Sequence, residues 1–160
     1  MASDWRVIGA SVQGAAHQKV GLACQDAHAY RVLPNGMLLV AVADGAGSAE
    51  RSEAGAQRAV MAALDALEGM AVWPEDEVGW SEVLAEAFSQ AQRCLDQFAE
   101  SESLPSRAFA TTLTCVAASE AGLAVGQLGD GVAVAGLEPG ELFIAAPPQR
   151  GEYANETYFL

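Results

Sequence analysis

The stretch LLVAVADGAGSAERSEAGAQ, from Leu38 to Gln57, decides the fold. It begins as an apolar run typical of a buried strand, breaks at Asp44-Gly45-Ala46-Gly47-Ser48, and resumes with helical periodicity. A lone aspartate before glycines at a strand end suits three chemistries: a phosphate-binding loop, a nucleophilic aspartate or a metal ligand. A tight turn without a chemical role is the alternative.

The composition indicates one acidic globular domain. The chain has 160 residues, 51% hydrophobic and 18% charged, which is enough to bury a core. Its 21 acidic residues against 8 Lys and Arg give a net charge of −13. That charge argues against nucleic acid and anionic membranes as partners, because both need a basic face. It is compatible with divalent cations, and also with a role in solubility alone.

The N-terminus and the cysteines indicate a cytoplasmic protein. Residues 1–12 lack a basic segment followed by an apolar run, so no signal peptide is predicted. The apolar stretch Met37–Ala43 is too short to span a bilayer. Cys24, Cys94 and Cys115 are widely spaced without a CxxC motif, which favours reduced thiols over disulfides or a zinc site.

Alternating apolar residues predict strands in both halves of the chain. The Asn35-Gly36 pair predicts a type I′ hairpin turn, because both central positions of that turn need positive φ. The later strands have short links, so we expect them to be antiparallel neighbours. The strand at Met37–Ala43 is apolar on both faces and should be central. The expected strands are Trp5–Val12, Ala27–Leu33, Met37–Ala43, Phe109–Ser119, Gly122–Leu128, Val132–Leu137 and Glu141–Ala146.

Two helices are predicted between these groups of strands. Apolar residues recur every three or four positions from about Ser52 to Gly69 and from Trp80 to Phe98, and Ser81 is the expected cap of the second helix. Strands, a helix pair and then strands define an α+β protein with antiparallel sheets. A doubly wound parallel sheet would alternate strands and helices throughout.

The residues around Asp44 leave a metal ligand as the favoured chemistry. A dinucleotide fingerprint would need glycine where Glu50 stands, and no Gly-Lys-Ser/Thr triplet of a P-loop is present. The D-x-D-G motif of aspartyl-nucleophile phosphatases would need aspartate where Val42 stands. A carboxylate on a strand end, followed by Gly45 with an accessible carbonyl, suits a hard divalent cation.

Two further aspartates are candidate partners of Asp44. Asp26, in CQDAHAY, precedes a strand expected to pair with the one that ends at Asp44, so the two carboxylates should converge. Asp130, in LGDGV, lies between two later strands. Each has a structural alternative: Asp26 as a turn cap, Asp130-Gly131 as a type I′ hairpin turn, and Asp44 as a turn residue.

Five stretches occur in an order that resembles a known family. They are GASVQGAAHQKVGLACQDAHAY, VAVADGAGSAERSEAGA, FATTLTCV, GQLGDGVAV and GEYANETYFL. Together they are similar to the metal-dependent protein phosphatases of the 2C type (the PPM family), especially small bacterial members. The resemblance implies two stacked antiparallel β-sheets flanked by helices, an α-β-β-α sandwich. It also implies that phosphoserine and phosphothreonine of protein substrates are hydrolysed by a metal-activated water at two Mg²⁺ or Mn²⁺ ions.

The resemblance also implies roles for individual residues. Asp44 would bridge both ions and Gly45 would bind one through its carbonyl oxygen. Asp26 would hold a metal-bound water, which makes Asp26 and Asp44 the expected catalytic residues. Asp130 would support the site and could ligate an additional ion. The strand at Ala110-Thr111-Thr112 would line the site, and the structural alternative for its side chains is packing as β-branched residues of a core strand.

The chain departs from the family pattern in three places. Ala46 stands where many members have histidine as a candidate general acid. No arginine shortly precedes Asp26, so His17 and Lys19 are the candidates for binding substrate phosphate. No aspartate follows Asp130, although the family's chains continue and supply further metal ligands.

These departures set the remaining expectations. Residues 1–160 are expected to form a single phosphatase 2C-like domain truncated at its C-terminus. Uncovered apolar surface of such a domain should favour self-association. The function expected from the resemblance is a serine/threonine protein phosphatase, and the alternative is a catalytically inactive binding or regulatory module.

Overall fold

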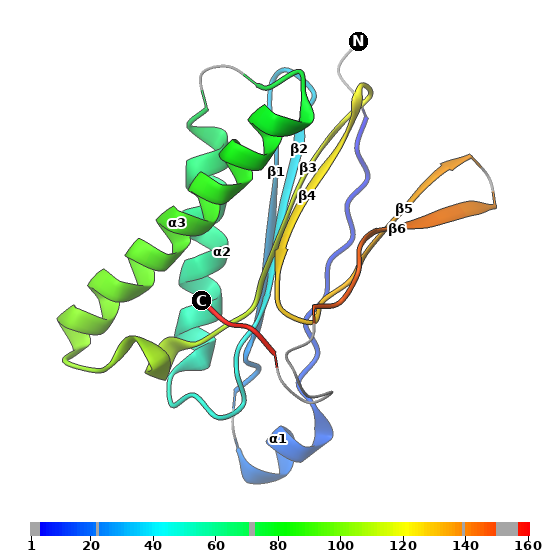
Figure 1. Cartoon of the computed structure of the whole chain (residues 1–160). Helices are drawn as coiled ribbons and strands as arrows, with labels where there is room; N and C mark the ends of the chain where they lie inside the picture. Colours follow the sequence, from blue (N-terminus) through cyan, green and yellow to red (C-terminus); the bar gives the residue numbers. More distant parts are fainter. Residues whose placement is uncertain (1–3, 22, 71–72, 139, 150–156) are drawn as a thin grey trace.

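A computed structural model describes residues 4–21, 23–70, 73–138, 140–149 and 157–160 (Figure 1). It confirms an α+β fold of antiparallel sheets and helices. One sheet has four strands in the order β1-β2-β3-β4, and β5 and β6 form a separate two-stranded sheet. The elements are α1 Ala15–Val20, β1 Asp26–Val32, β2 Leu38–Asp44, α2 Ser52–Glu68, α3 Glu77–Glu102, the 3₁₀ helix η1 Ser106–Phe109, β3 Leu113–Ser119, β4 Gly122–Leu128, β5 Ala133–Glu138 and β6 Glu141–Ala146.

Strand β2 is central, as its apolar character predicts. It pairs with β1 on one side and β3 on the other, both antiparallel. Its alternate residues Leu39, Ala41 and Ala43 are at most 1% exposed. They lie on the face that α2 and α3 cover (Figure 1). The opposite face, called the outer face below, carries Val42, which is 47% exposed.

The two predicted helices are confirmed, with a different start for the second. Helix α3 begins after Asp76, whose carboxylate accepts a hydrogen bond of 2.8 Å from the Gly79 N–H. The prediction of Ser81 as the cap was therefore wrong by more than a turn. An aspartate cap with Glu77 in the first turn suits the positive end of the helix dipole. In the described part of the chain, no helix is long and apolar enough to cross a bilayer.

The β1–β2 hairpin is confirmed, but its type I′ turn is not. Gly36 has φ +84°, whereas Asn35 is not among the described non-glycine residues with positive φ. The Gly36 N–H donates to the Leu33 carbonyl at 2.9 Å, which closes a turn with Pro34 at its second position. The turn is therefore centred on Pro34 and Asn35, one residue before the predicted pair, and proline's φ near −65° is incompatible with type I′ there.

The strand predicted at Trp5–Val12 is absent, because residues 4–14 lie in no strand or helix. This segment crosses the outer face of the sheet. A Cβ on Gly9 would lie 2.5 Å from the His28 ring, and Ser11 Oγ lies 2.9 Å from His28 Nδ1. A segment that crosses a face meets side chains rather than the free N–H and C=O groups of a strand edge. Apolar alternation therefore did not produce a strand here.

The later strands are partly as predicted. Strands β4 and β6 have the predicted bounds, and β5 is shifted by one residue. Strand β3 starts four residues late, because Ser106–Phe109 form a 3₁₀ turn that packs the fully buried Phe109 under the helices. The expected antiparallel pairing of β4 with β5 was wrong, since β5 pairs with β6 and belongs to the other sheet.

Candidate metal centre

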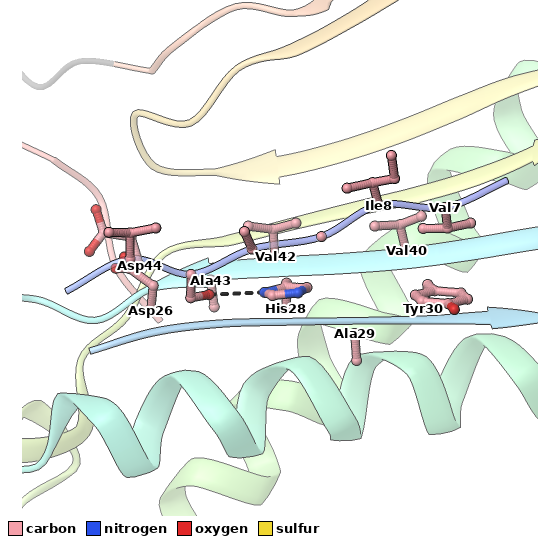
Figure 2. A pocket seen from close by; sticks show the side chains of 14 residues that line it. Val7, Ile8, Asp26, His28, Ala29, Tyr30, Val40, Val42, Ala43 and Asp44 are labelled. Carbon is pink, nitrogen blue, oxygen red and sulfur yellow. Dashed lines mark hydrogen bonds between the residues drawn. The ribbon is translucent and has the colours of Figure 1, made fainter. Parts of the chain in front are cut away.

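Asp26 and Asp44 lie side by side at one end of the four-stranded sheet. Asp26 is the first residue of β1 and Asp44 the last of β2, and the antiparallel register pairs them directly. Residues directly opposite in such a pair have Cβ atoms about 4.5–5.5 Å apart, on the same face. Figure 2 shows both aspartates together at one end of a pocket on the outer face. The sequence-based expectation that they converge agrees with this arrangement.

The pair is electrostatically unfavourable as it stands. The pKa of Asp44 is raised from 3.8 to about 6, first by partial burial of its carboxyl group, then by the negative charge of Asp26 and a hydrogen bond with it. The charge of Asp130 raises the pKa of Asp44 further. Like charges held together favour the protonated form of one of them. A cation between these groups would remove the repulsion.

Asp130 does not occupy a hairpin turn. It follows β4 in the link from one sheet to the other, so the alternative of a type I′ turn between paired strands was wrong. The neighbouring Gly129 has φ +116°. The Gln127 amide donates to the carbonyl oxygens of Gly129 and Gly131, at 3.3 and 2.9 Å. The Gly129 N–H donates to Gln149 Oε1 at 3.2 Å, so two glutamine side chains hold this loop.

Gly45 is buried and lies where a side chain has no room. A Cβ at this position would lie 2.7 Å from the Gln25 carbonyl oxygen and 2.8 Å from Ser52 Cβ. The Gly45 N–H donates to that Gln25 carbonyl at 3.1 Å, and Gly45 forms an isolated bridge with Thr111. The glycine that follows Asp44 therefore permits close packing of the loop between β2 and α2, beside the aspartate pair.

The pocket beside the aspartates has a volume of about 440 Å³. Its other labelled side chains in Figure 2 are mostly apolar and come from β1, β2 and the N-terminal segment. Ile8, on that segment, is 98% exposed, so the pocket is open to solvent. The pocket thus pairs two carboxylates with an apolar wall.

The candidates for phosphate binding lie apart from this pocket lining. His17 and Lys19 belong to the short helix α1, with His17 half-buried and Lys19 exposed, and neither lines the pocket. In Figure 1, α1 lies beyond the end of the sheet where β1 begins. Ala46 is 6% exposed and its N–H donates to the Ala110 carbonyl, so the position of the family's histidine is buried here.

The donor set suits one hard cation better than a complete two-ion centre. Carboxylates and a backbone carbonyl are the oxygen ligands that Mg²⁺ and Mn²⁺ prefer. Within the described ranges, however, no group of three or more His, Cys, Asp or Glu side chains lies close enough to hold an ion. Asp26 and Asp44 therefore place two carboxylates side by side, and the negative charge of Asp130 acts on Asp44.

Sequence reasoning missed the polar residues that fix the aspartates. Thr111 and Thr112 were expected on a strand that lines the site, but their hydrogen bonds to Asp44 were not foreseen. Gln127 and Gln149 were not singled out. A pair of adjacent threonines at a strand start is a weak signal, because β-branched residues are common in strands for packing reasons alone.

Comparison with known proteins places the chain in a family. The profile of the family described as protein phosphatase 2C matches residues 13–160, and the chain belongs to this family. Among its relatives is serine/threonine-protein phosphatase 3 of Escherichia coli (strain K12), which is 35% identical over 163 residues. The matched region covers 98% of this chain and 63% of that protein, so the chain spans less than two thirds of the relative's length. The predicted resemblance to the 2C-type phosphatases is confirmed.

Proposed function

We propose that the chain is part of a metal-dependent phosphatase that hydrolyses phosphoserine and phosphothreonine in proteins. The observation that carries this proposal is the aspartate pair, in which Asp26 and Asp44 face each other in register and the pKa of Asp44 is raised to about 6. Perturbed carboxyl groups beside an open pocket are typical of functional sites. The family and the name of the E. coli relative support the reaction class.

The proposed ligands are Asp26, Asp44, the Gly45 carbonyl and Asp130, with Mg²⁺ or Mn²⁺ as the ion. A bound pair of such ions would lower the pKa of a water molecule and neutralise charge on a phosphate group. The chain's own part is to hold the carboxylates at adjacent strand ends, with the apolar pocket wall beside them. Two ions would need more ligands than these four residues supply.

His17 and Lys19 are proposed to bind the substrate phosphate. Both lie in the last turn of α1, beyond the end of the sheet where the aspartates lie (Figure 1). The exposed ammonium of Lys19 is a rare positive charge in a chain with 8 Lys and Arg residues. If this proposal holds, Lys19→Ala weakens phosphopeptide binding several-fold, whereas Arg93→Ala on α3, whose side chain pairs with Glu86, does not.

A phosphate-release assay tests the proposed function. A phosphoserine peptide with Mn²⁺ is given to the 160-residue chain and to any longer natural protein that contains it. We expect turnover in the longer protein, its loss in Asp44→Asn, and little or no turnover by the 160-residue chain. Asp4→Asn, an exposed aspartate near the N-terminus, is the matched control. Full turnover in Asp44→Asn would contradict the site; fast turnover by the 160-residue chain would contradict the expectation that its few carboxylates do not organise two ions.

A non-catalytic binding module is the second candidate function. It is favoured by the absence of a three-ligand cluster among the described residues and by the buried Ala46. This alternative predicts that a longer protein binds phosphopeptide with measurable affinity but releases no phosphate at any Mn²⁺ concentration. The two candidates therefore separate in one pair of measurements, binding and turnover.

Self-association is part of the proposal for this chain. The outer face and the β5–β6 sheet expose Val42, Leu142 and Ile144 at 47%, 75% and 62%. Exposed apolar surface on sheets favours association. We expect sedimentation to show dimers or larger species at high concentration, reduced in Ile144→Lys. A monomer at all concentrations would contradict this expectation.

The proposal has two further parts, a phosphorylated protein as the substrate and a cytoplasmic location. The cytoplasmic location is compatible with the three free thiols.

A further inference from the structure

Thr112 lies between Asp44 on one side and Gly129, the residue before Asp130, on the other. It directly precedes β3, and continuing the register of the sheet places it opposite Asp44 on β2 and opposite Gly129 after β4. Its side chain is on the same face as Asp44, because β-strand residues paired directly across a sheet share a face. Thr112 is 6% exposed, so its hydroxyl group is buried beside the aspartate pair.

The hydroxyl of Thr112 replaces a ladder hydrogen bond at Asp44. At the hydrogen-bonded positions of an antiparallel ladder, two opposite residues exchange both N–H···O=C bonds. Here the Thr112 N–H donates to the Asp44 carbonyl at 2.8 Å as expected. The reciprocal donor, the Asp44 N–H, bonds to Thr112 Oγ1 at 2.9 Å instead of the Thr112 carbonyl. The regular backbone ladder between β2 and the residues before β3 therefore ends at Asp44, where a side-chain hydroxyl takes the place of a backbone carbonyl.

The neighbouring Thr111 reinforces this arrangement. Its hydroxyl group is completely buried and lies 3.0 Å from the Asp44 carbonyl and 3.1 Å from the Thr112 carbonyl. A hydroxyl donates one hydrogen, so it serves either carbonyl in turn. The Asp44 carbonyl, which also accepts from the Thr112 N–H, is therefore tied to both threonines.

The methyl group of Thr112 contacts the segment that carries Asp130. A Cβ on Gly129 would lie 2.5 Å from Thr112 Cγ2 and 2.7 Å from Thr112 Cβ. No Cβ fits at those distances, so the threonine methyl packs directly on the backbone of Gly129. Asp130 is the next residue. The Thr112 side chain thus contacts both segments: its hydroxyl group accepts from the Asp44 N–H, and its methyl group packs on Gly129, the residue before Asp130.

We propose that Thr112 is a positioning residue of the metal centre, which fixes Asp44 relative to Asp130. This inference rests on the proposed function, because it concerns the same metal site. Removing the hydroxyl leaves the Asp44 N–H to bond to the Thr112 carbonyl, as in a regular ladder, or to go without a partner. Either outcome moves the carboxylate of Asp44. Groups that orient ligands commonly contribute about 10–100-fold to metal affinity.

Three variants separate the roles of the side chain. Thr112→Val keeps the branched shape against Gly129 and removes the acceptor of the Asp44 N–H. Thr112→Ser keeps the hydroxyl and removes the methyl. Thr114→Val is the control for the bond to Asp44, since Thr114 lies two residues along on the same face, opposite Val42, and its hydroxyl instead approaches Gly131.

The test measures Mn²⁺ affinity by calorimetry, together with hydrogen exchange of the Asp44 amide without metal. We expect Thr112→Val to lower Mn²⁺ affinity at least about tenfold and to speed exchange at Asp44. Thr112→Ser and Thr114→Val should stay within about threefold of the parent chain. Parental Mn²⁺ affinity in Thr112→Val, with faster exchange at Asp44, would show a structural role only and overturn the inference. Absence of Mn²⁺ binding by the parent chain would instead overturn the proposed function and, with it, the role of Thr112.

Discussion

Both faces of the four-stranded sheet carry mainly apolar side chains, but one face is covered by helices and the other is partly exposed to solvent. On β2, Leu39 and Ala41 are completely buried under the helices, while Val42 on the outer face is 47% exposed. Hydrophobicity alone therefore does not distinguish the faces. The helix-covered face belongs to the buried hydrophobic core, and the outer face carries the aspartate pair and its pocket. The aspartate pair lies at one end of this apolar surface, where partial burial raises the pKa of Asp44.

The largest expected difference between the faces is in folding stability. Leu39→Ala leaves a cavity under α2 and α3 and should cost about 2–5 kcal/mol of unfolding free energy. Leu123, on the outer face of β4, is 41% exposed, so Leu123→Ala should cost less than about 1 kcal/mol. Urea unfolding of both variants measures the difference. Equal costs would show that the outer face is as firmly packed as the helix-covered one.

A smaller effect should distinguish the two ends of β4. Gly129 has φ +116° and no room for a Cβ beside Thr112, so Gly129→Ala should cost roughly 1–3 kcal/mol. Gly122, the first residue of the same strand, has open space around its Cα, and Gly122→Ala should be close to neutral. Thermal unfolding of the two variants tests this. If Gly129→Ala unfolds like the parent, the outer face is not tightly packed at its aspartate end.

The smallest effect is the dependence of stability on pH. The folded pKa of Asp44, about 6, lies above the ordinary 3.8, so the folded state binds more protons than the unfolded state between these values. The contribution of Asp44 to stability therefore falls as pH rises through this window. In metal-free buffer, Asp44→Asn should unfold at a higher temperature than the parent near pH 7, and the difference should shrink towards about pH 4. A difference in unfolding temperature that does not change with pH would contradict a raised pKa of Asp44 in the folded state.

The sequence predicts the fold where one rule decides each element. Helical spacing located α2, and a strand apolar on both faces identified β2 as central. It failed where the environment decides: Trp5–Val12 alternates like a strand but crosses a sheet face, and the turn is centred on Pro34-Asn35 instead of Asn35-Gly36. Local patterns do not record which backbone groups find partners in space.

The candidate site was predictable only in part, for a related reason. Hairpin pairing of two predicted strands places Asp26 opposite Asp44, so their convergence follows from the sequence. The hydrogen bond that fixes the Asp44 N–H comes from Thr112, which is 68 residues away in the chain. No periodicity reports a contact of that separation. The position of Asp130 likewise depends on Gln127 and Gln149, whose amide groups act through the folded loop.

Titration of the 160-residue chain with Mn²⁺ in a calorimeter, near neutral pH, tests the central claim that the aspartate pair is a metal site. Two or three carboxylates that repel one another should hold one ion weakly, because Mg²⁺-like ions accept water for the missing ligands. We predict weak binding that is lost in Asp44→Asn and retained in Asp4→Asn. Unchanged Mn²⁺ affinity in Asp44→Asn would contradict the assignment of the site.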